Sequence, residues 1–329
     1  MPLLAAGTVL FLTSCFKDDE MIPPHPAGTV STDTIAMTQT YRYQVYFDLK
    51  GQAATGTNVK SESDLAFDCS PGGWMILLNT ADFMYAADLG IVPFGTPKDT
   101  TGVHWKFDKS DGDPDSLAIG QWFQVAGGDT LSNNHVWLIN AGLDDLGNSL
   151  GFYQAIFDSL KNGTFYFRYA SLDGTYSHAG SVKKDTAVNF MYYSFVFESE
   201  KPFEPAKDNW DLLFTQYTTL LYTDLGEPYP YLVTGVLVNR NGVEVATDTT
   251  LSFESIDAAK ATLMTFSGSL DAIGYEWKYY DFELGTYTVD YKKNYIIRTH
   301  DGYLFKLRFV GFYNLSGEKG YPVIEYQEL

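Results

Sequence analysis

The fold of this chain is decided by its last segment, NYIIRTHDGYLFKLRFVGFYNLSGEKGYPVIEYQEL, residues 294–329. An aromatic and β-branched run at 295–299 leads into a His-Asp-Gly turn, and residues 303–310 return with large apolar side chains at alternate positions. This pattern predicts two antiparallel strands. After a polar break, residues 321–326 have the composition of a closing strand, with Pro322 near its start, where a missing N–H is tolerated. We therefore expect the chain to end in a β-meander.

The composition extends this prediction to the whole chain. Its 329 residues are enough for one large or two ordinary domains, and 24 tyrosines with 23 phenylalanines favour β-structure over helical bundles. Two segments have helical features: Asp144–Leu160, where apolar residues follow a period close to 3.6, and Ile256–Thr265, which is rich in alanine. We predict a mainly β protein with minor helix.

The charge balance excludes one class of partner. The chain has 41 acidic and 22 basic side chains, which give a formal net charge of -19. Such a protein is repelled by phosphate backbones and by anionic membrane surfaces. We expect no nucleic-acid partner.

The N-terminus has the features of a lipoprotein signal. Residues 3–12 form an apolar run too short to span a bilayer, and Leu12-Thr13-Ser14-Cys15 has the form of a lipobox. We predict a signal peptide at 1–14 and lipidation of Cys15, which would attach the protein to the membrane. The alternative is an ordinary apolar leader followed by an incidental cysteine. Residues 17–20, Lys-Asp-Asp-Glu, resemble the acidic export signal of surface lipoproteins in the Bacteroidota, which implies an outer-membrane anchor facing the cell exterior.

A tether and two related units are expected after the lipidated cysteine. Residues 15–40 are rich in proline, glycine, serine and threonine and lack apolar periodicity, which is typical of a linker. A weak internal repeat then relates residues 41–183 to residues 184–329. Its matching aromatic strands are 43–47 with 193–197 and 63–67 with 210–214, followed by three further matches in the same order. The alternative is that aromatic strands resemble one another by chance.

Motifs in the second unit carry a family resemblance. Trp210-Asp211, Trp277 before the meander, and the Arg298-Thr299-His300-Asp301-Gly302 turn together resemble the HmuY family. The resemblance covers about 192–329 directly and the first unit only through the repeat. It implies two tandem HmuY-like antiparallel β domains of lipid-anchored, haem-binding type.

The haem ligands that this resemblance implies are not found at the expected positions. The family uses His or Met side chains as axial ligands, one of them just after the tryptophan that precedes the meander. Residues 278–283 contain neither His nor Met, and residues 244–254 contain neither for the second ligand. Met264 is the nearest candidate, and His104 beside Trp105 is a candidate from the first unit. We therefore expect no cofactor, with haem as the possible exception.

Signatures of catalysis are scarce. The sequence has no His-Glu-x-x-His, Gly-x-Ser-x-Gly or Cys-x-x-Cys motif, and its five histidines are isolated. The acidic loop at 108–115 suits either a calcium ion or, more simply, solvation. Cys69 is expected to be a buried free thiol. We predict that the protein is not an enzyme and that it holds no metal.

Aromatic residues offer a second class of function. Trp74, Trp122 and Trp137, together with Tyr229 and Tyr231, suit a sugar-stacking platform or a protein interface, and the alternative is that each packs in the core. The segment Glu227-Pro228-Tyr229-Pro230-Tyr231 predicts an exposed loop, so Tyr229 and Tyr231 are candidate interface residues.

Three functions follow from these observations. The first is a non-enzymatic binding or accessory subunit of an outer-membrane transporter or assembly, whose partner is an outer-membrane protein complex. The second is a haem-binding, haemophore-like protein for iron acquisition. The third is a polysaccharide-binding module.

Overall fold

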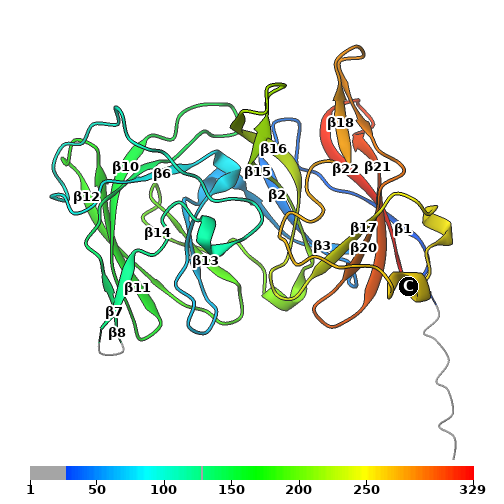
Figure 1. The fold of residues 1–329 in the computed structure, drawn as a ribbon, viewed down its shortest axis with the longest axis horizontal. Helices are drawn as coiled ribbons and strands as arrows, with labels where there is room; N and C mark the ends of the chain where they lie inside the picture. Colours follow the sequence, from blue (N-terminus) through cyan, green and yellow to red (C-terminus); the bar gives the residue numbers. More distant parts are fainter. Residues whose placement is uncertain (1–26, 127–128) are drawn as a thin grey trace, which may run out of the picture.

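The computed structural model describes residues 27–126 and 129–329, and it confirms a mainly β protein (Figure 1). Its one α-helix in the described ranges is α1 (Ala258–Ala261). The strands are β1 (Ser31–Thr34), β2 (Tyr43–Asp48), β3 (Ala53–Val59), β4 (Leu65–Asp68), β5 (Ile76–Leu78), β6 (Tyr85–Asp88), β7 (Phe123–Ala126), β8 (Asp129–Ser132), β9 (Trp137–Asn140), β10 (Phe152–Lys161), β11 (Thr164–Ser171), β12 (Ser177–Lys183), β13 (Phe190–Ser194), β14 (Ser199–Lys201), β15 (Leu212–Tyr222), β16 (Pro228–Val238), β17 (Glu244–Asp248), β18 (Lys278–Asp281), β19 (Thr286–Val289), β20 (Asn294–Arg298), β21 (Leu304–Tyr313) and β22 (Lys319–Glu328).

The predicted C-terminal meander is confirmed. β20, β21 and β22 pair in sequence within a five-stranded antiparallel sheet of order β1-β22-β21-β20-β17. The turn between β20 and β21 is closed by a hydrogen bond from Thr299 N to Tyr303 O of 2.9 Å, and Gly302 supplies the positive φ of 88°. Phe305, Leu307 and Phe309 are buried at alternate positions, as the pattern predicts.

The folded part begins earlier than the sequence predicts. β1 pairs with β22 in the register Ser31↔Tyr326, and Met37 is fully buried in the core. The predicted tether, 15–40, therefore extends too far, because its residues from 31 onward belong to the folded part. A polar strand is accepted here because β22 would otherwise be the edge of the sheet, and its unpaired backbone groups need no apolar side chain to bind them. The signal peptide and Cys15 lie outside the described residues.

The two central sheets combine strands from both parts of the sequence. β2 pairs with β15 in a sheet of order β16-β15-β2-β3, and β13 pairs with β4 in a sheet of order β14-β13-β4-β5. The two predicted repeat units therefore exchange strands. The first strand of each unit (β2 or β13) pairs with the second strand of the other unit (β15 or β4). Tandem domains with a boundary at 183/184 stay a prediction, since both sheets contain strands from either side of that boundary.

The predicted helix at 144–160 is wrong. Residues 152–161 form β10, which pairs with β11 on one side and with β9 and β8 on the other. Residues 154–157 of this strand are all buried, Gln154 included, and a strand buried on both faces lacks the alternation that would distinguish it from a buried helix. Gly151 has a φ of 95°, which a helix does not allow.

The second predicted helix, 256–265, is confirmed in part. α1 is only four residues long, and the Asp257 side chain caps it by accepting a hydrogen bond from Lys260 N at 2.9 Å.

Two aromatic-rich cores hold these sheets together. One lies under the C-terminal sheet and includes Phe47, Phe214 and Trp277, and the other lies under the sheet of order β12-β11-β10-β8-β7 and includes Phe67, Trp122 and Trp137. The first core contains residues of β2 and the second contains residues of β13. Each core therefore depends on side chains from both parts of the sequence.

Candidate binding surface

Two β-hairpins project from the same edge of the molecule (Figure 1). Hairpin A consists of β15 and β16, which pair from Leu212↔Val238 to Tyr222↔Pro228. Hairpin B consists of β18 and β19, which pair from Lys278↔Val289 to Asp281↔Thr286. The turns at residues 223–227 and 282–285 form the two tips.

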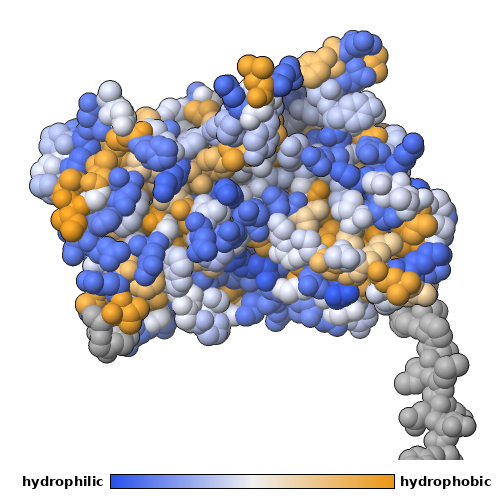
Figure 2. Space-filling view, viewed as in Figure 1, coloured by the Kyte–Doolittle hydropathy of each residue, from blue (hydrophilic) through white to orange (hydrophobic). Residues whose placement is uncertain are grey.

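Apolar side chains are unusually exposed at both tips. Leu225 is 86% exposed on hairpin A, and Phe282 and Leu284 are 89% and 70% exposed on hairpin B. Figure 2 shows hydrophobic residues at the ends of both projections. Tyrosines continue the surface down the strands: Tyr222, Tyr229, Tyr231, Tyr279 and Tyr280. Exposed apolar groups gathered in this way are typical of an interaction site.

Local turn chemistry presents these side chains. On hairpin B the Asp281 carboxylate accepts hydrogen bonds from Glu283 N at 2.9 Å and from Leu284 N at 3.0 Å, and Gly285 has a φ of 67°. On hairpin A Thr223 N donates to Glu227 O at 3.0 Å. Sequence reasoning missed these apolar tips. The available signal was an apolar residue inside a short segment that begins with Asp and ends with Gly, at 224–226 and at 281–285.

A buried lysine joins the bases of the two hairpins. Lys278 of hairpin B is 8% exposed, and its Nζ donates to Thr234 O of hairpin A at 2.5 Å. The same Nζ faces the rings of Trp277, Phe312 and Tyr287 at 4.3, 5.0 and 5.7 Å. Burial lowers the pKa of Lys278 to about 7. The lysine thus fixes the two hairpins to each other where no water screens it.

Tyrosines of the two hairpins also lie near each other. Burial raises the pKa of Tyr287 in hairpin B, and the neighbouring hydroxyl of Tyr231 in hairpin A raises it further. Tyr229 and Tyr231 are 39% and 52% exposed, with ring centroids 6.3 Å apart. Their exposure agrees with the sequence, and their role in an interface stays a prediction.

The prediction of a loop at residues 227–231 is wrong for most of the segment. Pro228 and Pro230 lie in β16, opposite Tyr222 and Leu220 of β15. Proline is tolerated because β16 is an edge strand, where a missing N–H on the outer side breaks no ladder bond.

The hairpin surface is acidic as well as apolar. Residues 212–239 and 279–291 contain no lysine, arginine or histidine. The tips carry Asp224 and Glu227 on hairpin A and Glu283 on hairpin B, and Asp281 ends β18 beside the second tip. A partner for this surface needs apolar groups and basic ones.

The candidate haem ligands do not come together. His104 is exposed in the segment between β6 and β7, and Met264 is half-buried against a small cluster that includes Ile256 and Ile296. Neither residue lines any of the three main cavities. The two side chains belong to different parts of the structure.

Other histidines and methionines do not supply an axial pair. Among the described histidines, His135 and His178 contact Asp88 and Glu198 at 2.8 and 3.3 Å, and His300 lies 4.0 Å from Asp208. Met37 and Met84 are fully buried in the two cores. The two predicted ligands, His104 and Met264, therefore do not form an axial pair for haem.

Other sequence candidates are structural. Asp108 of the acidic loop is 3% exposed and accepts hydrogen bonds from Leu78 N and Ala118 N, both at 2.7 Å, so it is not free for calcium. Asp111, Asp113 and Asp115 of the same loop are exposed, as solvation predicts. The described residues contain no cluster of three or more His, Cys, Asp or Glu able to hold a metal. Cys69 is buried and free, as predicted.

The tryptophans do not form a sugar platform. Trp122 and Trp137 are 0% and 2% exposed, and Trp74 packs against the same core. The described part of the chain contains no helix with the length and apolar character needed to cross a membrane.

The comparison with protein families settles the resemblance. A family model described as HmuY protein matches residues 40–326. The chain belongs to the HmuY family. The match includes the first part of the chain, which the sequence motifs reached only through the internal repeat.

Several solved structures are similar to this chain at low identity. Apo PinO from Porphyromonas gingivitis is 10% identical, with 92% of this chain and 97% of that chain covered and a TM-score of 0.30. The apo HmuY analog from Tannerella forsythia is 10% identical, with 91% and 95% covered and a TM-score of 0.26. A Bacteroides vulgatus protein described as a candidate HmuY-like haem-binding protein is 18% identical, with 53% and 90% covered and a TM-score of 0.19. Curated proteins give no sequence match.

Proposed function

We propose that this HmuY-family protein is a non-enzymatic binding or accessory subunit, anchored in the outer membrane through Cys15 and facing the cell exterior. The observation that supports it is the concentration of exposed apolar side chains on the tips of hairpins A and B. The described chain begins beside the C-terminus, where Gly28 N donates to Glu328 O at 2.9 Å, on the side away from the tips (Figure 1). An anchor at that end leaves both hairpins free to bind a partner.

The proposed partner is an outer-membrane protein complex, a transporter or an assembly. Its binding surface would bury Leu225, Phe282 and Leu284 and place basic side chains against the acidic residues of the tips. Burying three such side chains contributes roughly 1.5–3 kcal/mol each, before the cost of association is subtracted. This is enough for the tips to dominate the affinity.

The test is cross-linking of the full lipidated chain in its native membrane, followed by detergent extraction and identification of the complex. The test variant combines Leu225→Ser, Phe282→Ser and Leu284→Ser. We expect it to reach the surface in normal amount and to lose the cross-linked partner.

A matched control carries Ile91→Ser and Val196→Ser, which change side chains that are 76% and 67% exposed but lie outside both hairpins. This variant should retain the partner. If the tip variant retains the partner as well as the control does, the hairpins are not the binding surface.

Haem binding is the second candidate, and family membership favours it. Tyrosine oxygen also serves as an axial ligand of haem iron, and the hairpin surface is rich in exposed tyrosines. The test is a haem titration of the form lacking residues 1–20, with absorbance read in both oxidation states. A saturable Soret band would direct mutation first to Met264, His104 and the hairpin tyrosines. A flat titration would reject haem and leave the protein partner.

A further inference from the structure

The two central sheets leave a cavity of about 150 Å³ between them. Side chains alternate along a strand, and β2 directs Phe47 into the core under the C-terminal sheet. Gln44 and Tyr46 of the same strand face the other way and line the cavity. On the second sheet, Tyr193 of β13 belongs to the other core, and Tyr192 lines the cavity. The cavity therefore lies between the faces that the two sheets turn away from the cores.

Most of the cavity wall is apolar. Aliphatic side chains of both sheets form it, among them Leu65, Ala66, Leu213 and Leu237. An apolar cavity of about 150 Å³ is large enough to hold benzene. This one is partly open, so a molecule of that size can enter it without unfolding either sheet.

One end of the Gln44 amide is unpaired in the cavity wall. The side chain is 6% exposed, and its Oε1 accepts a long hydrogen bond from Thr215 Oγ1 at 3.3 Å. The same hydroxyl donates to Gln216 O at 2.9 Å, although it has only one proton to share. The amide nitrogen of Gln44 makes no hydrogen bond to any residue that the structure describes. A buried amide in this state gains free energy from a new hydrogen-bond partner.

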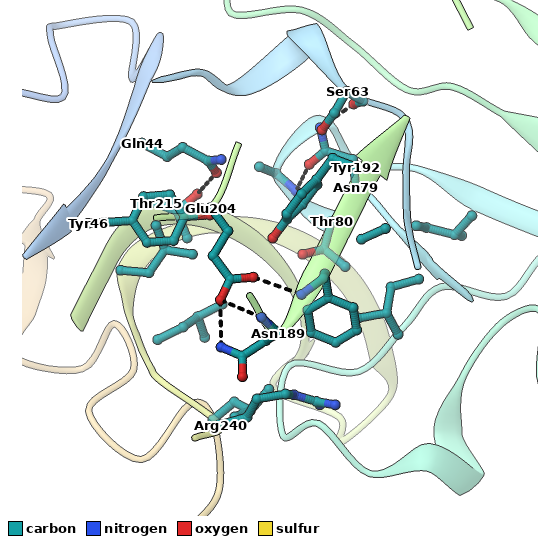
Figure 3. Close-up of a pocket in the computed structure, with 18 of the residues that line it drawn as sticks. Gln44, Tyr46, Ser63, Asn79, Thr80, Asn189, Tyr192, Glu204, Thr215 and Arg240 are labelled. Atoms are coloured by element: carbon teal, nitrogen blue, oxygen red, sulfur yellow. Dashed lines mark hydrogen bonds between the residues drawn. The ribbon is translucent and has the colours of Figure 1, made fainter. Parts of the chain in front are cut away.

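The Tyr192 hydroxyl lies on the opposite wall. Within the described parts of the chain it has no hydrogen-bond partner, and Figure 3 shows it and the Gln44 amide pointing into the space between the two sheets. Burial raises the pKa of Tyr46, and the nearby Tyr192 raises it further, yet the Tyr46 hydroxyl is without a hydrogen-bond partner. A ligand hydroxyl both donates and accepts, so a single one can bond to the amide of Gln44 and to Tyr192.

The charges around the cavity favour a neutral ligand. Glu204 and Arg240 both line it, so an anion meets the carboxyl group and a cation meets the guanidinium. The Glu204 oxygens already accept hydrogen bonds from Asn189 and Phe190, so this carboxyl needs no donor from a ligand. A charged ligand would also lose its hydration in this apolar space.

We propose that the cavity binds a small neutral phenol, with its ring against the aliphatic wall and its hydroxyl between Gln44 and Tyr192. The site is separate from the hairpin surface and goes beyond the proposed function. A benzene-sized ring fills the apolar part, and the hydroxyl satisfies the two unpaired groups at the polar end.

The test is a titration of the full chain, followed by fluorine NMR, with three probes. 4-Fluorophenol has the ring and the hydroxyl, fluorobenzene has the ring alone, and 4-fluorobenzoate is an anion of similar size. We expect saturable binding of 4-fluorophenol, about fivefold or more weaker binding of fluorobenzene, and no binding of 4-fluorobenzoate. The proposal would be overturned by equal affinities for 4-fluorophenol and either other probe, or by no saturable binding of 4-fluorophenol.

Three variants separate the polar end from the apolar wall. Gln44→Leu and Tyr192→Phe each remove one polar partner and nearly keep the size of the side chain. Each should weaken the binding of 4-fluorophenol about threefold or more and leave that of fluorobenzene unchanged. Ala66→Leu adds volume to the wall and should abolish the binding of both probes. Unchanged binding of 4-fluorophenol in both polar variants would refute the site.

Two controls locate the binding in the cavity. Tyr85→Phe removes the hydroxyl of a half-buried tyrosine that does not line it. The triple variant Leu225→Ser, Phe282→Ser and Leu284→Ser removes the exposed apolar tips and leaves the cavity unchanged. Both should bind 4-fluorophenol with wild-type affinity. Loss of binding in the tip variant would place the phenol on the hairpins and exclude the cavity.

Discussion

Replacing Lys278 by methionine should change the stability of the protein in opposite directions at low and high pH. Lys278 is 8% exposed, and its Nζ has one oxygen acceptor, Thr234 O. Methionine has a similar length and no charge, so it removes the buried ammonium and leaves that carbonyl without its donor. The two consequences have different pH dependences, which makes them separable.

The magnitude follows from the pKa of the buried amine. In the unfolded chain the pKa of lysine is about 10.5, and in the fold burial lowers it to about 7. That difference corresponds to roughly 5 kcal/mol at 1.36 kcal/mol per pKa unit. The folded state binds fewer protons than the unfolded state between about pH 7 and pH 10.5, so wild-type stability rises with pH across this window and the cost of the charge is greatest below pH 7. The three rings facing Nζ stabilise the ammonium and make roughly 5 kcal/mol an upper limit.

The unpaired carbonyl of Thr234 has the opposite effect on the stability of the variant. Leaving Thr234 O without its donor costs about 1–3 kcal/mol at any pH. At pH 6 the variant should therefore be more stable than the wild type by about 2 kcal/mol or more. At pH 10 the unfolded-state lysine is still mostly charged and roughly 1 kcal/mol of the charge cost remains, so the variant should be less stable by up to about 2 kcal/mol.

The assay is urea unfolding of both proteins at pH 6, 8 and 10, followed by tryptophan fluorescence. Tyrosine titration at high pH cancels in the difference because both proteins contain the same tyrosines. Lys161→Met, which changes an exposed lysine at the end of β10, is the control and should differ from the wild type by the same small amount at every pH. A difference for Lys278→Met that stays constant from pH 6 to pH 10 would refute the reasoning.

Two further predictions concern single positions. Gly320→Ala should destabilise the fold by about 2 kcal/mol or more in urea unfolding, because Gly320 has a φ of 92° and an added Cβ would lie 2.1 Å from Thr38 O. Gly317→Ala is its control, since φ is 78° there but a Cβ would meet nothing within 4 Å, and a loss as large as that of Gly320→Ala would exclude the contact as the cause. Cys69 is 2% exposed and burial raises the pKa of its thiol, so the native protein should react with a thiol reagent far more slowly than the protein in concentrated urea; equal rates would show that Cys69 is accessible.

The candidate site shows where sequence reasoning succeeded and where it failed. Tyr229 and Tyr231 were selected because prolines beside them suggested exposure, and they are exposed, although on a strand rather than in a loop. The tips of the hairpins could have been selected by the apolar residues in their turns. Lys278 could not, since nothing in the neighbouring sequence reveals that it is buried.

The sequence by itself determined the local elements of this protein. Alternation in 303–310, the turn residues before it and the composition of 321–326 specified the meander, because strand pairing between neighbours and turn geometry depend on residues close together in the chain. The same local rules failed at β10, where burial on both faces removed the alternation that distinguishes a strand.

Only the tertiary structure decided which distant strands pair. The reciprocal exchange of β2 and β13 between the central sheets, the docking of β1 on β22, and the cavity between the central sheets all join residues far apart in sequence. Backbone N–H and C=O groups are the same in almost every residue, so backbone hydrogen bonds alone do not select one strand partner over another. The choice between such pairings is made by the packing of whole faces against each other. That packing is a property of the complete fold, which no short segment of this sequence contains.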